Sequence, residues 1–144
     1  RDVAPKINKP KPALIHNIMI PALGGPKGKM SASNENETIY TVDSPETVKK
    51  KINKYAFSGG QPDIEEHRKK GGNPDIDVSY QYLRIFFEPD DKKLKQIYDD
   101  YKSGKMLTGE LKEILIQKIN AFLKSHQEKR ESAKNQLDKF LYKE

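Results

Sequence analysis

The chain has 144 residues, of which 34% are hydrophobic and 33% are charged, with a formal net charge of +6. It contains no cysteine, which excludes disulfide bonds and thiolate metal sites, and it has no apolar run long enough to cross a bilayer. The excess of positive charge favours a polyanionic partner such as nucleic acid. The absence of cysteine and of a bilayer-spanning run favours a soluble, intracellular protein. Because the chain begins at Arg1 and its first methionine is Met19, we expect a piece of a longer polypeptide.

The first forty residues predict an extended connector, one buried strand and a loop. Three prolines separated by lysines in residues 1–12 favour an extended connector over a helix. The mostly apolar residues 13–20, which Pro21 follows, are typical of a strand buried on both faces of a parallel sheet. The glycines of residues 24–28 then predict a turn, and residues 39–42 predict a final edge strand.

Residues 29–33 read Lys-Met-Ser-Ala-Ser and have the composition of a phosphate-binding loop. Glycines allow backbone N–H groups to approach a ligand, lysine supplies a mobile cation, and small hydroxyl residues leave room for phosphate oxygens. The stretch lacks the glycine spacing of a P-loop, so a kinase-like or GTPase-like site is not predicted. On composition alone, an exposed flexible loop is an equally good interpretation.

From Ser44 onward the sequence predicts helices. Ser44 can cap a first helix that starts with Pro45, and the glycine pair at 59 and 60 marks its end. A second, mostly polar helix is expected from Pro62 to the glycine pair at 71 and 72. In the first helix an apolar stripe is set against four lysines that lie largely away from it: Val48, Ile52, Tyr55 and Ala56 against Lys49, Lys50, Lys51 and Lys54.

Three further helices complete the expected bundle. Asp75 or Asp77 can cap a third helix that ends before Pro89, a fourth ends at Gly104, and the last runs from Thr108 to the end of the chain without a breaker. The length of this last helix makes it the expected spine of the bundle. The stripes expected to face the core are Val78, Tyr82, Ile85 and Phe86; Leu94, Ile97, Tyr98 and Tyr101; and Leu111, Ile114, Leu115, Ile119, Phe122, Leu123, Ala133, Leu137, Phe140 and Leu141.

Positive charge is concentrated where the helices begin. Residues 49–70 contain seven Lys or Arg against three Asp or Glu. Cationic helix faces beside glycine turns suit contacts with nucleic-acid phosphates, although a solvated lysine face is the commoner reason for such a pattern. Tyr55 and Phe57 could stack on unpaired bases, but aromatic residues at this spacing belong more often to a core, and we assign Phe57 to the core.

Neither a metal site nor a nucleophilic serine is predicted. Zinc requires at least three clustered ligands, and a serine nucleophile requires a positioned base and an orienting acid. The three histidines, His16, His67 and His126, show no ligand spacing. The neighbouring carboxylates of Glu65 and Glu66 are better explained by a helix start than by hydrolytic chemistry.

Several stretches together resemble a known family. Residues 29–33 resemble the second signature loop of class I aminoacyl-tRNA synthetases, and the remainder resembles tryptophanyl-tRNA synthetase. The resemblance is to its eukaryotic cytosolic branch, in which alanine is also found at the fourth position of the loop. The matching stretches are distributed along most of the chain: residues 1–5, 10–14, 54–60, 65–68, 71–73 and 107–112.

The resemblance implies a mainly α fold in two parts. Residues 1–43 would be the C-terminal end of a Rossmann-like α/β catalytic domain, and residues 44–144 an α-helical anticodon-binding bundle. The intact enzyme would be a cytoplasmic homodimer, with no membrane attachment, that activates tryptophan with ATP and Mg²⁺ and transfers it to tRNA. The present chain would lack the first half of the active site, so we expect it to be inactive alone but able to bind tRNA.

The resemblance also implies roles for individual residues. Lys29, Ser31 and Ser33 would be catalytic: Lys29 stabilises the triphosphate and the pyrophosphate leaving group, and the two serines shape the loop. No residue is assigned to a metal. The residues expected to bind ATP are Ile18, Met19, Ile20, Lys29, Met30 and Ser31. The residues expected to bind tRNA are Lys54, Gln61, Asp63, His67 and Arg68.

The chain departs from the family pattern at two places. Asn34-Glu35 follows the loop where the family has Asp-Pro, and Gln61-Pro62-Asp63 stands where it has an arginine, an acidic residue and a threonine. Two alternatives stay open. One is a noncatalytic tRNA-binding or signalling fragment, and the other is a tyrosine-specific synthetase, which shares the architecture.

Overall fold

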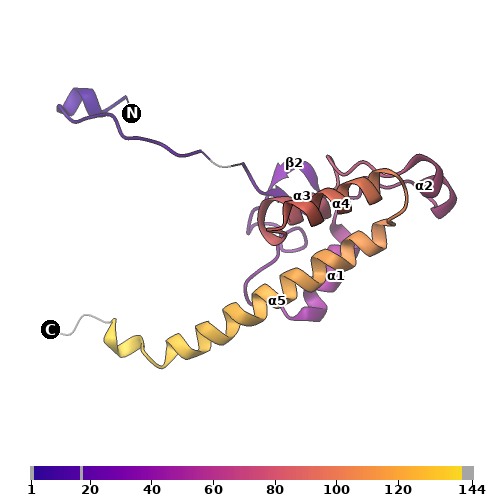
Figure 1. Ribbon diagram of the computed structural model, residues 1–144. Coiled ribbons are helices and arrows are strands. Elements are labelled where there is room, and N and C mark those ends of the chain that lie inside the picture. The colour runs from indigo at the N-terminus through magenta and orange to yellow at the C-terminus, as the bar shows by residue number, and fades with distance from the viewer. Residues whose placement is uncertain (1, 17, 141–144) are drawn as a thin grey trace.

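The computed structural model describes residues 2–16 and 18–140 (Figure 1). Arg1 in the expected connector, Asn17 in the expected strand, and residues 141–144, including Leu141 of the expected last helix, lie outside this part. The described residues are mainly helical with a two-stranded sheet, which confirms the mainly α prediction. The elements are the 3₁₀ helix η1 (Ala4–Ile7), β1 (Pro21–Ala22), β2 (Gly25–Lys29), α1 (Pro45–Tyr55), α2 (Ile64–Lys70), α3 (Val78–Tyr82), the π-helical turn η2 (Leu83–Phe87), α4 (Asp91–Lys102), α5 (Thr108–Lys134) and the 3₁₀ turn η3 (Leu137–Lys139).

The helices begin where short polar side chains can cap them. The Ser44 hydroxyl accepts a hydrogen bond from the Thr47 N–H at 3.2 Å and starts α1, with Pro45 as its first residue. Asp77 caps α3 in the same way, and Asp63 caps α2, which therefore begins at Ile64 instead of Pro62. The predicted order of helices after residue 44 is confirmed, with boundaries displaced by a few residues.

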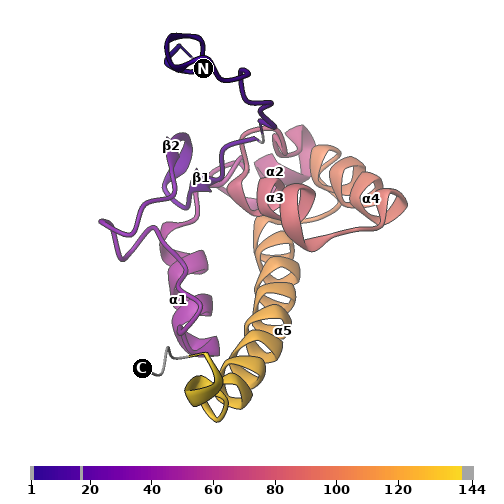
Figure 2. The ribbon, with the colours of Figure 1, turned by 90° about the vertical axis from the view of Figure 1, so that its left-hand side faces the viewer.

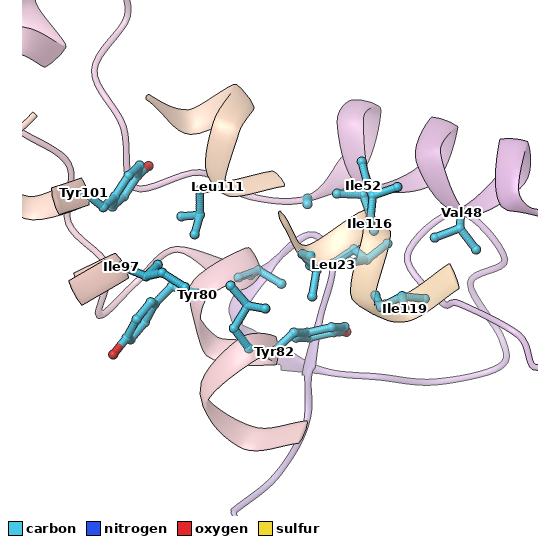
Figure 3. Packing of buried hydrophobic residues seen from close by; sticks show 14 of the residues in the cluster. Leu23, Val48, Ile52, Tyr80, Tyr82, Ile97, Tyr101, Leu111, Ile116 and Ile119 are labelled. Atoms are coloured by element: carbon cyan, nitrogen blue, oxygen red, sulfur yellow. The ribbon is translucent and has the colours of Figure 1, made fainter. Parts of the chain in front are cut away.

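The core lies between α1, α3 and α5, with the β1–β2 hairpin against it. Figure 3 shows side chains from all of these elements meeting. Ile52 of α1, Leu111 of α5 and Leu23 of the hairpin are fully buried. Leu23 thus joins the helical core across the predicted division at residue 43. Completely burying one such side chain contributes roughly 1.5–3 kcal/mol, so the hairpin is attached firmly.

The third predicted helix, with the apolar stripe Val78, Tyr82, Ile85 and Phe86, contains a π-helical turn that its sequence does not predict. The Glu88 N–H donates to the Leu83 carbonyl at 2.8 Å, five residues back. Leu83, at the start of this wider turn, lies in the core, whereas Phe86, expected to face the core, is 51% exposed. Phe57 was also assigned to the core, and that assignment is wrong because its side chain is 42% exposed.

The last helix is shorter than predicted. It ends at Lys134, and the later stripe residues Leu137 and Phe140 are 57% and 78% exposed. An apolar stripe needs a facing element, and α1, which runs beside α5 in Figure 2, has 11 residues against 27 in α5. In the described structure the C-terminal part of α5 therefore lacks a partner helix.

Both predicted strands before Ser44 are wrong. Residues 13–16 and 18–20 form no strand, and the Ile15 and Met19 side chains are 94% and 66% exposed. A strand buried on both faces needs neighbouring strands, and the described residues supply only the antiparallel pair of β1 and β2. Residues 39–42 instead lead into a turn, which the Asp43 N–H closes on the Tyr40 carbonyl at 3.1 Å.

The connector at the beginning of the chain also differs from the prediction. It contains η1, in which Pro5 is tolerated because the first turn needs no N–H donor there. η1 lies apart from the other helices in both views (Figures 1 and 2). None of the helices formed by residues 2–16 and 18–140 combines the length and the apolar character needed to span a bilayer.

Candidate functional site

Lys29 stands at the end of a short antiparallel hairpin. Pro21 of β1 pairs with Lys29 of β2, and the Met30 N–H donates to the Ile20 carbonyl at 3.0 Å. The glycine-rich stretch predicted to be a turn therefore largely forms β2. The hairpin is fastened to the core because the Tyr82 hydroxyl donates to the Pro21 carbonyl at 2.7 Å. Lys29 itself is exposed, so its position is fixed at the backbone while its ammonium reaches solvent.

The loop after Lys29 is held through its backbone. The Thr38 hydroxyl donates to the Ser31 carbonyl at 2.6 Å, and the Tyr40 hydroxyl donates to the Ala32 carbonyl at 2.9 Å. The Ser31 hydroxyl is 3.3 Å from the Ser33 hydroxyl and accepts the Ser33 N–H at 3.4 Å. These bonds leave both serines exposed. The two serines and Lys29 are thus brought together at one exposed loop.

Asn34 shapes the exit of the loop, where the chain departs from the family pattern. Its side-chain oxygen accepts the Asn36 N–H at 3.2 Å, and its own N–H donates to the Ser31 carbonyl at 3.2 Å. Asparagine supports such turns by hydrogen bonding to the backbone two residues on. The Asn34-Glu35 pair therefore forms a turn that contains no proline.

A largely buried ion pair next to the loop is not evident from the sequence. The Lys51 ammonium of α1 contacts the Asp43 carboxylate at 2.7 Å and donates to the Thr38 carbonyl at 2.8 Å. The Tyr40 N–H donates to the same carboxylate at 2.9 Å. From sequence, Lys51 looked like one of several solvated lysines, and an ion pair formed across a helix cap has no fixed sequence spacing. Only the turn at residues 40–43 brings the two charges together.

The residues expected to bind ATP are not all gathered in one cavity. Ile20 and Met30 line an apolar groove of about 400 Å³ that continues to Phe86 and Phe122. Ile18 and Ile20 line a neighbouring cavity of about 510 Å³, and Met19 is exposed. Lys29 and Ser31 line neither of these two cavities. Within residues 2–16 and 18–140, no group of three or more His, Asp or Glu side chains is placed to hold a metal ion.

His67, expected to contact tRNA, is buried in this structure. Its side chain is 3% exposed and packs beside the Tyr101 ring, with the ring centroids 5.2 Å apart. Nε2 donates to the Met106 carbonyl at 2.9 Å, and Nδ1 accepts the Gln61 N–H at 3.4 Å. With both ring nitrogens used, the imidazole joins α2 to the turn before α5 and has no free polar atom for RNA. In this structure His67 therefore has a supporting position, and its expected contact with tRNA stays a prediction.

Of the other residues expected to bind tRNA, Gln61, Asp63 and Arg68 lie at or next to α2, which carries His67, and also have structural partners. The Arg68 guanidinium donates to the Gly104 carbonyl at 2.9 Å and to the Lys105 carbonyl. Gln61 donates to the Gly71 carbonyl at 3.0 Å, and Asp63 accepts the Glu66 N–H at 2.7 Å. Lys54, on α1, is exposed with its ammonium 5.2 Å from the centre of the Tyr55 ring. Lys54 lies apart from the other four residues, on α1.

A cavity of about 450 Å³ opens between α2 and the start of α5. Its volume falls in the range typical of small-molecule sites. Carboxylate, amide and hydroxyl groups converge on it, and His67 lies among the lining residues. The cavity is lined by Gln61, Pro62, Asp63, Ile64, His67, Leu107, Thr108, Gly109 and Glu110.

The Ser-Gly-Gly turn beside this cavity is held by a buried carboxylate. Asp77 accepts the Gly59 N–H and the Tyr101 hydroxyl, both at 2.9 Å. Burial, together with the nearby Asp77 charge, raises the pKa of Tyr101 to about 12. A Cβ at Gly59 would stand 2.0 Å from the Asn73 carbonyl oxygen, so only glycine fits there. The position of the Ser-Gly-Gly turn is therefore determined by the buried Asp77 carboxylate and by close packing against Asn73.

Comparison with known proteins assigns this arrangement to a family. The profile of the "tRNA synthetases class I (W and Y)" family matches residues 1–124. The chain is 58% identical over 142 residues to a tryptophan–tRNA ligase of Sulfurisphaera tokodaii, covering 99% of this chain and 37% of that protein. It is 52% identical over 139 residues to the human cytoplasmic tryptophan–tRNA ligase, covering 96% of this chain and 29% of that protein.

Solved structures give the same result. A tryptophanyl-tRNA synthetase from Giardia lamblia superposes with a TM-score of 0.83 at 46% identity, covering 91% of this chain and 32% of that one. The chain thus spans about a third of the length of the relatives it matches. These relatives are named for tryptophan, which argues against the tyrosine-specific alternative. The chain belongs to the class I tRNA synthetases of the tryptophan and tyrosine type, and within them to the tryptophanyl-tRNA synthetases.

Proposed function

We propose that the chain is the C-terminal part of a tryptophan–tRNA ligase, which activates tryptophan with ATP and transfers it to its tRNA. The observation that carries this proposal is the loop of residues 29–33. An exposed lysine stands at the end of a fastened hairpin, and two exposed serines follow on a loop whose backbone is hydrogen-bonded. Relatives with this function cover the same segment at 52–58% identity.

In this proposal Lys29 acts on the ATP phosphates. When the tryptophan carboxylate attacks the α-phosphorus, negative charge grows on the departing pyrophosphate. An ammonium group that approaches this charge in the transition state lowers the barrier more than it strengthens ground-state binding. Ser31 and Ser33 keep the loop in the shape that lets Lys29 reach the phosphates, and Ile18, Met19, Ile20 and Met30 offer the nucleotide an apolar neighbourhood.

Magnesium would reach this site with the nucleotide. Magnesium in nucleotide enzymes is held largely by phosphate oxygens and water with one or two carboxylates, and it neutralises phosphate charge. Since the described residues offer no ligand cluster, we assign none of them to the metal.

The helical part would bind tRNA. We propose that residues 1–43 end a Rossmann-like catalytic domain and that residues 44–144 form the anticodon-binding bundle. The exposed cations of residues 49–70, with Lys54 and Arg68 among them, favour phosphate contacts. The 450 Å³ cavity, where Gln61 and Asp63 offer hydrogen-bonding groups, suits an unstacked base. A cytoplasmic location and a homodimer complete the proposal by analogy with the family.

The decisive experiment measures tryptophan-dependent exchange between ATP and pyrophosphate in the natural full-length protein. We expect exchange with tryptophan and at least about a hundredfold less with tyrosine. Equal exchange with both amino acids would support the tyrosine-type alternative, and none with either would contradict the proposed enzyme. Residues 1–144 alone should show no exchange, because half of the positioning groups would be missing.

Filter binding with tryptophan-specific tRNA at two salt concentrations tests the second part. Phosphate contacts must weaken steeply as salt rises. If tRNA binds the natural protein in this way without any amino-acid-dependent exchange, the noncatalytic tRNA-binding fragment is the better description. Binding that does not respond to salt would argue against the basic helical face as the RNA surface.

A further inference from the structure

Lys51 links the first helix of the bundle to the loop that carries Lys29. Its ammonium contacts the Asp43 carboxylate at 2.7 Å and donates to the Thr38 carbonyl at 2.8 Å, and it lies 4.6 Å from the centre of the Tyr40 ring. The side chains of the pair are 12% and 10% exposed, whereas the neighbouring Lys49 and Lys50 are exposed. Among the lysines of α1, Lys51 therefore has an interior position.

Besides Asp43, Lys51 contacts Thr38 and Tyr40, and each of these two residues is hydrogen-bonded to the loop. The Thr38 hydroxyl donates to the Ser31 carbonyl, and the Tyr40 hydroxyl donates to the Ala32 carbonyl. The Asp43 carboxylate also accepts the Tyr40 N–H. One ammonium group thus contacts both residues whose side chains fasten the loop, at the Ser31 and Ala32 carbonyls, two and three residues after Lys29.

The strength of this arrangement follows from its burial. Hydrogen bonds between charged groups are about twice as strong as neutral ones, and removing one partner of a buried pair leaves the other charge without compensation. Without the ammonium, Asp43 would turn toward water, and Tyr40 and Thr38 would lose their common support. The loop could then adopt many conformations, of which few present Lys29 and the serines together.

We propose that Lys51 is a positioning residue for the nucleotide-binding loop. It acts through Thr38, Tyr40 and Asp43, and it does not touch the nucleotide. This inference rests on the proposed function, and it adds that the helical bundle itself helps to organise the catalytic loop. It predicts that a change in α1, outside the loop, slows adenylate formation.

The test uses Lys51→Met in the natural full-length protein, with tryptophan-dependent pyrophosphate exchange as the readout. Misplacing a catalytic group by about 1 Å can cost a hundredfold in rate, so we expect kcat to fall by about tenfold to a hundredfold. The KM for tryptophan should hardly change, because the loop acts on phosphate. Lys51→Arg, which keeps the charge, should recover much of the lost rate.

Two control variants separate positioning from general stability. Lys118→Met removes another partly buried pair, Lys118 with Glu88 at 2.8 Å, and neither residue is hydrogen-bonded to residues 29–43 in the described structure. It should lower the melting temperature without changing kcat. Lys92→Met removes an exposed lysine from α4, outside the basic stretch of residues 49–70, and should change neither quantity. Tyr40→Phe removes one loop hydrogen bond, leaves the pair intact and should lower kcat to a smaller extent.

Hydrogen exchange supplies a readout that is independent of activity. In Lys51→Met, the amides of residues 31–38 should exchange faster than in the wild type, while those of α5 should not. If the wild type catalyses no exchange of pyrophosphate, the proposed function fails. The amide measurement would still show whether Lys51 holds the loop in place. An active wild type whose kcat is the same in Lys51→Met, or loop amides that keep their protection, would overturn the inference.

Discussion

Residues 30–43 and the helical core are stabilised by different kinds of interaction. The core is built from fully buried apolar side chains such as Ile52 and Leu115, whose loss cannot be relieved by small movements. In residues 30–43 the side chains of residues 31–36 are exposed, and only Met30 and Ile39 pack against the core. The loop is otherwise held by a few hydrogen bonds and one ion pair. Each net hydrogen bond contributes only about 1 kcal/mol. The comparison teaches that the loop can change its shape at low cost, while the bundle provides a fixed base.

The largest expected effect is a loss of stability in the helical core. Asp77→Ala removes the acceptor of the Gly59 N–H and the Tyr101 hydroxyl inside the core. We expect the free energy of unfolding to fall by about 3–5 kcal/mol, because each unsatisfied buried group costs about 1–3 kcal/mol. Denaturant titration measures it. Asp75→Ala, an exposed neighbour, should cost less than about 1 kcal/mol, and equal losses would contradict the distinction.

On the loop side, Lys29→Ala should affect catalysis and not stability. We expect the barrier to adenylate formation in the natural full-length protein to rise by roughly 2–4 kcal/mol, which is a loss of about thirtyfold to a thousandfold. The melting temperature should stay unchanged because Lys29 is exposed. Lys27→Ala, exposed on the same strand, should change the rate by at most about fivefold. Unaffected activation in Lys29→Ala would remove the role proposed for this residue.

A cap at the junction of the two regions gives an intermediate effect. Ser44→Ala removes the acceptor of the Thr47 N–H at the start of α1 and should lower the free energy of unfolding by about 1 kcal/mol. Ser44→Asn should retain most of the stability. If both substitutions cost the same, the capping hydrogen bond is not what the serine contributes.

The smallest expected effect concerns pH. The hydrogen bond from the Lys118 ammonium, helped by the Asp90 N–H, holds the pKa of Glu88 below its ordinary value of 4.5. A carboxyl whose pKa is lowered in the folded state stabilises the fold above 4.5, and that contribution is lost as the pH falls below this value. Because Lys118 is partly exposed, we expect less than about 1 kcal/mol. Unfolding of wild type and Glu88→Gln should therefore differ at neutral pH and converge in acid.

Local chemistry explains which elements could be predicted. The caps at Ser44 and Asp77 depend on residues two or three positions away, so the sequence contains the whole signal. The expected strand at residues 13–20 depended on partner strands that the described structure does not supply, and an apolar run alone cannot reveal its partners. The π-helical turn in η2 follows no simple sequence rule, so the displacement of Phe86 was also unpredictable.

The candidate site shows the same division. The loop of residues 29–33 was found because its signature is contiguous. The burial of His67 depends on the Met106 carbonyl, 39 residues later, and the role of Lys51 depends on a turn that folds Asp43 back toward α1. Such distant pairings cannot be read from spacing. The sequence therefore predicted the segment to which we assign the chemistry, and the structure identified the residues that hold this segment in place.

The unbroken course of α5 has a mechanical consequence. Its 27 residues form a rod about 40 Å long that begins beside the cavity at α2. Tilting a rod of that length by about 5° swings its far tip by roughly 3.5 Å. A small change in the direction of α5 at its first turn would therefore move its C-terminal end by several ångströms.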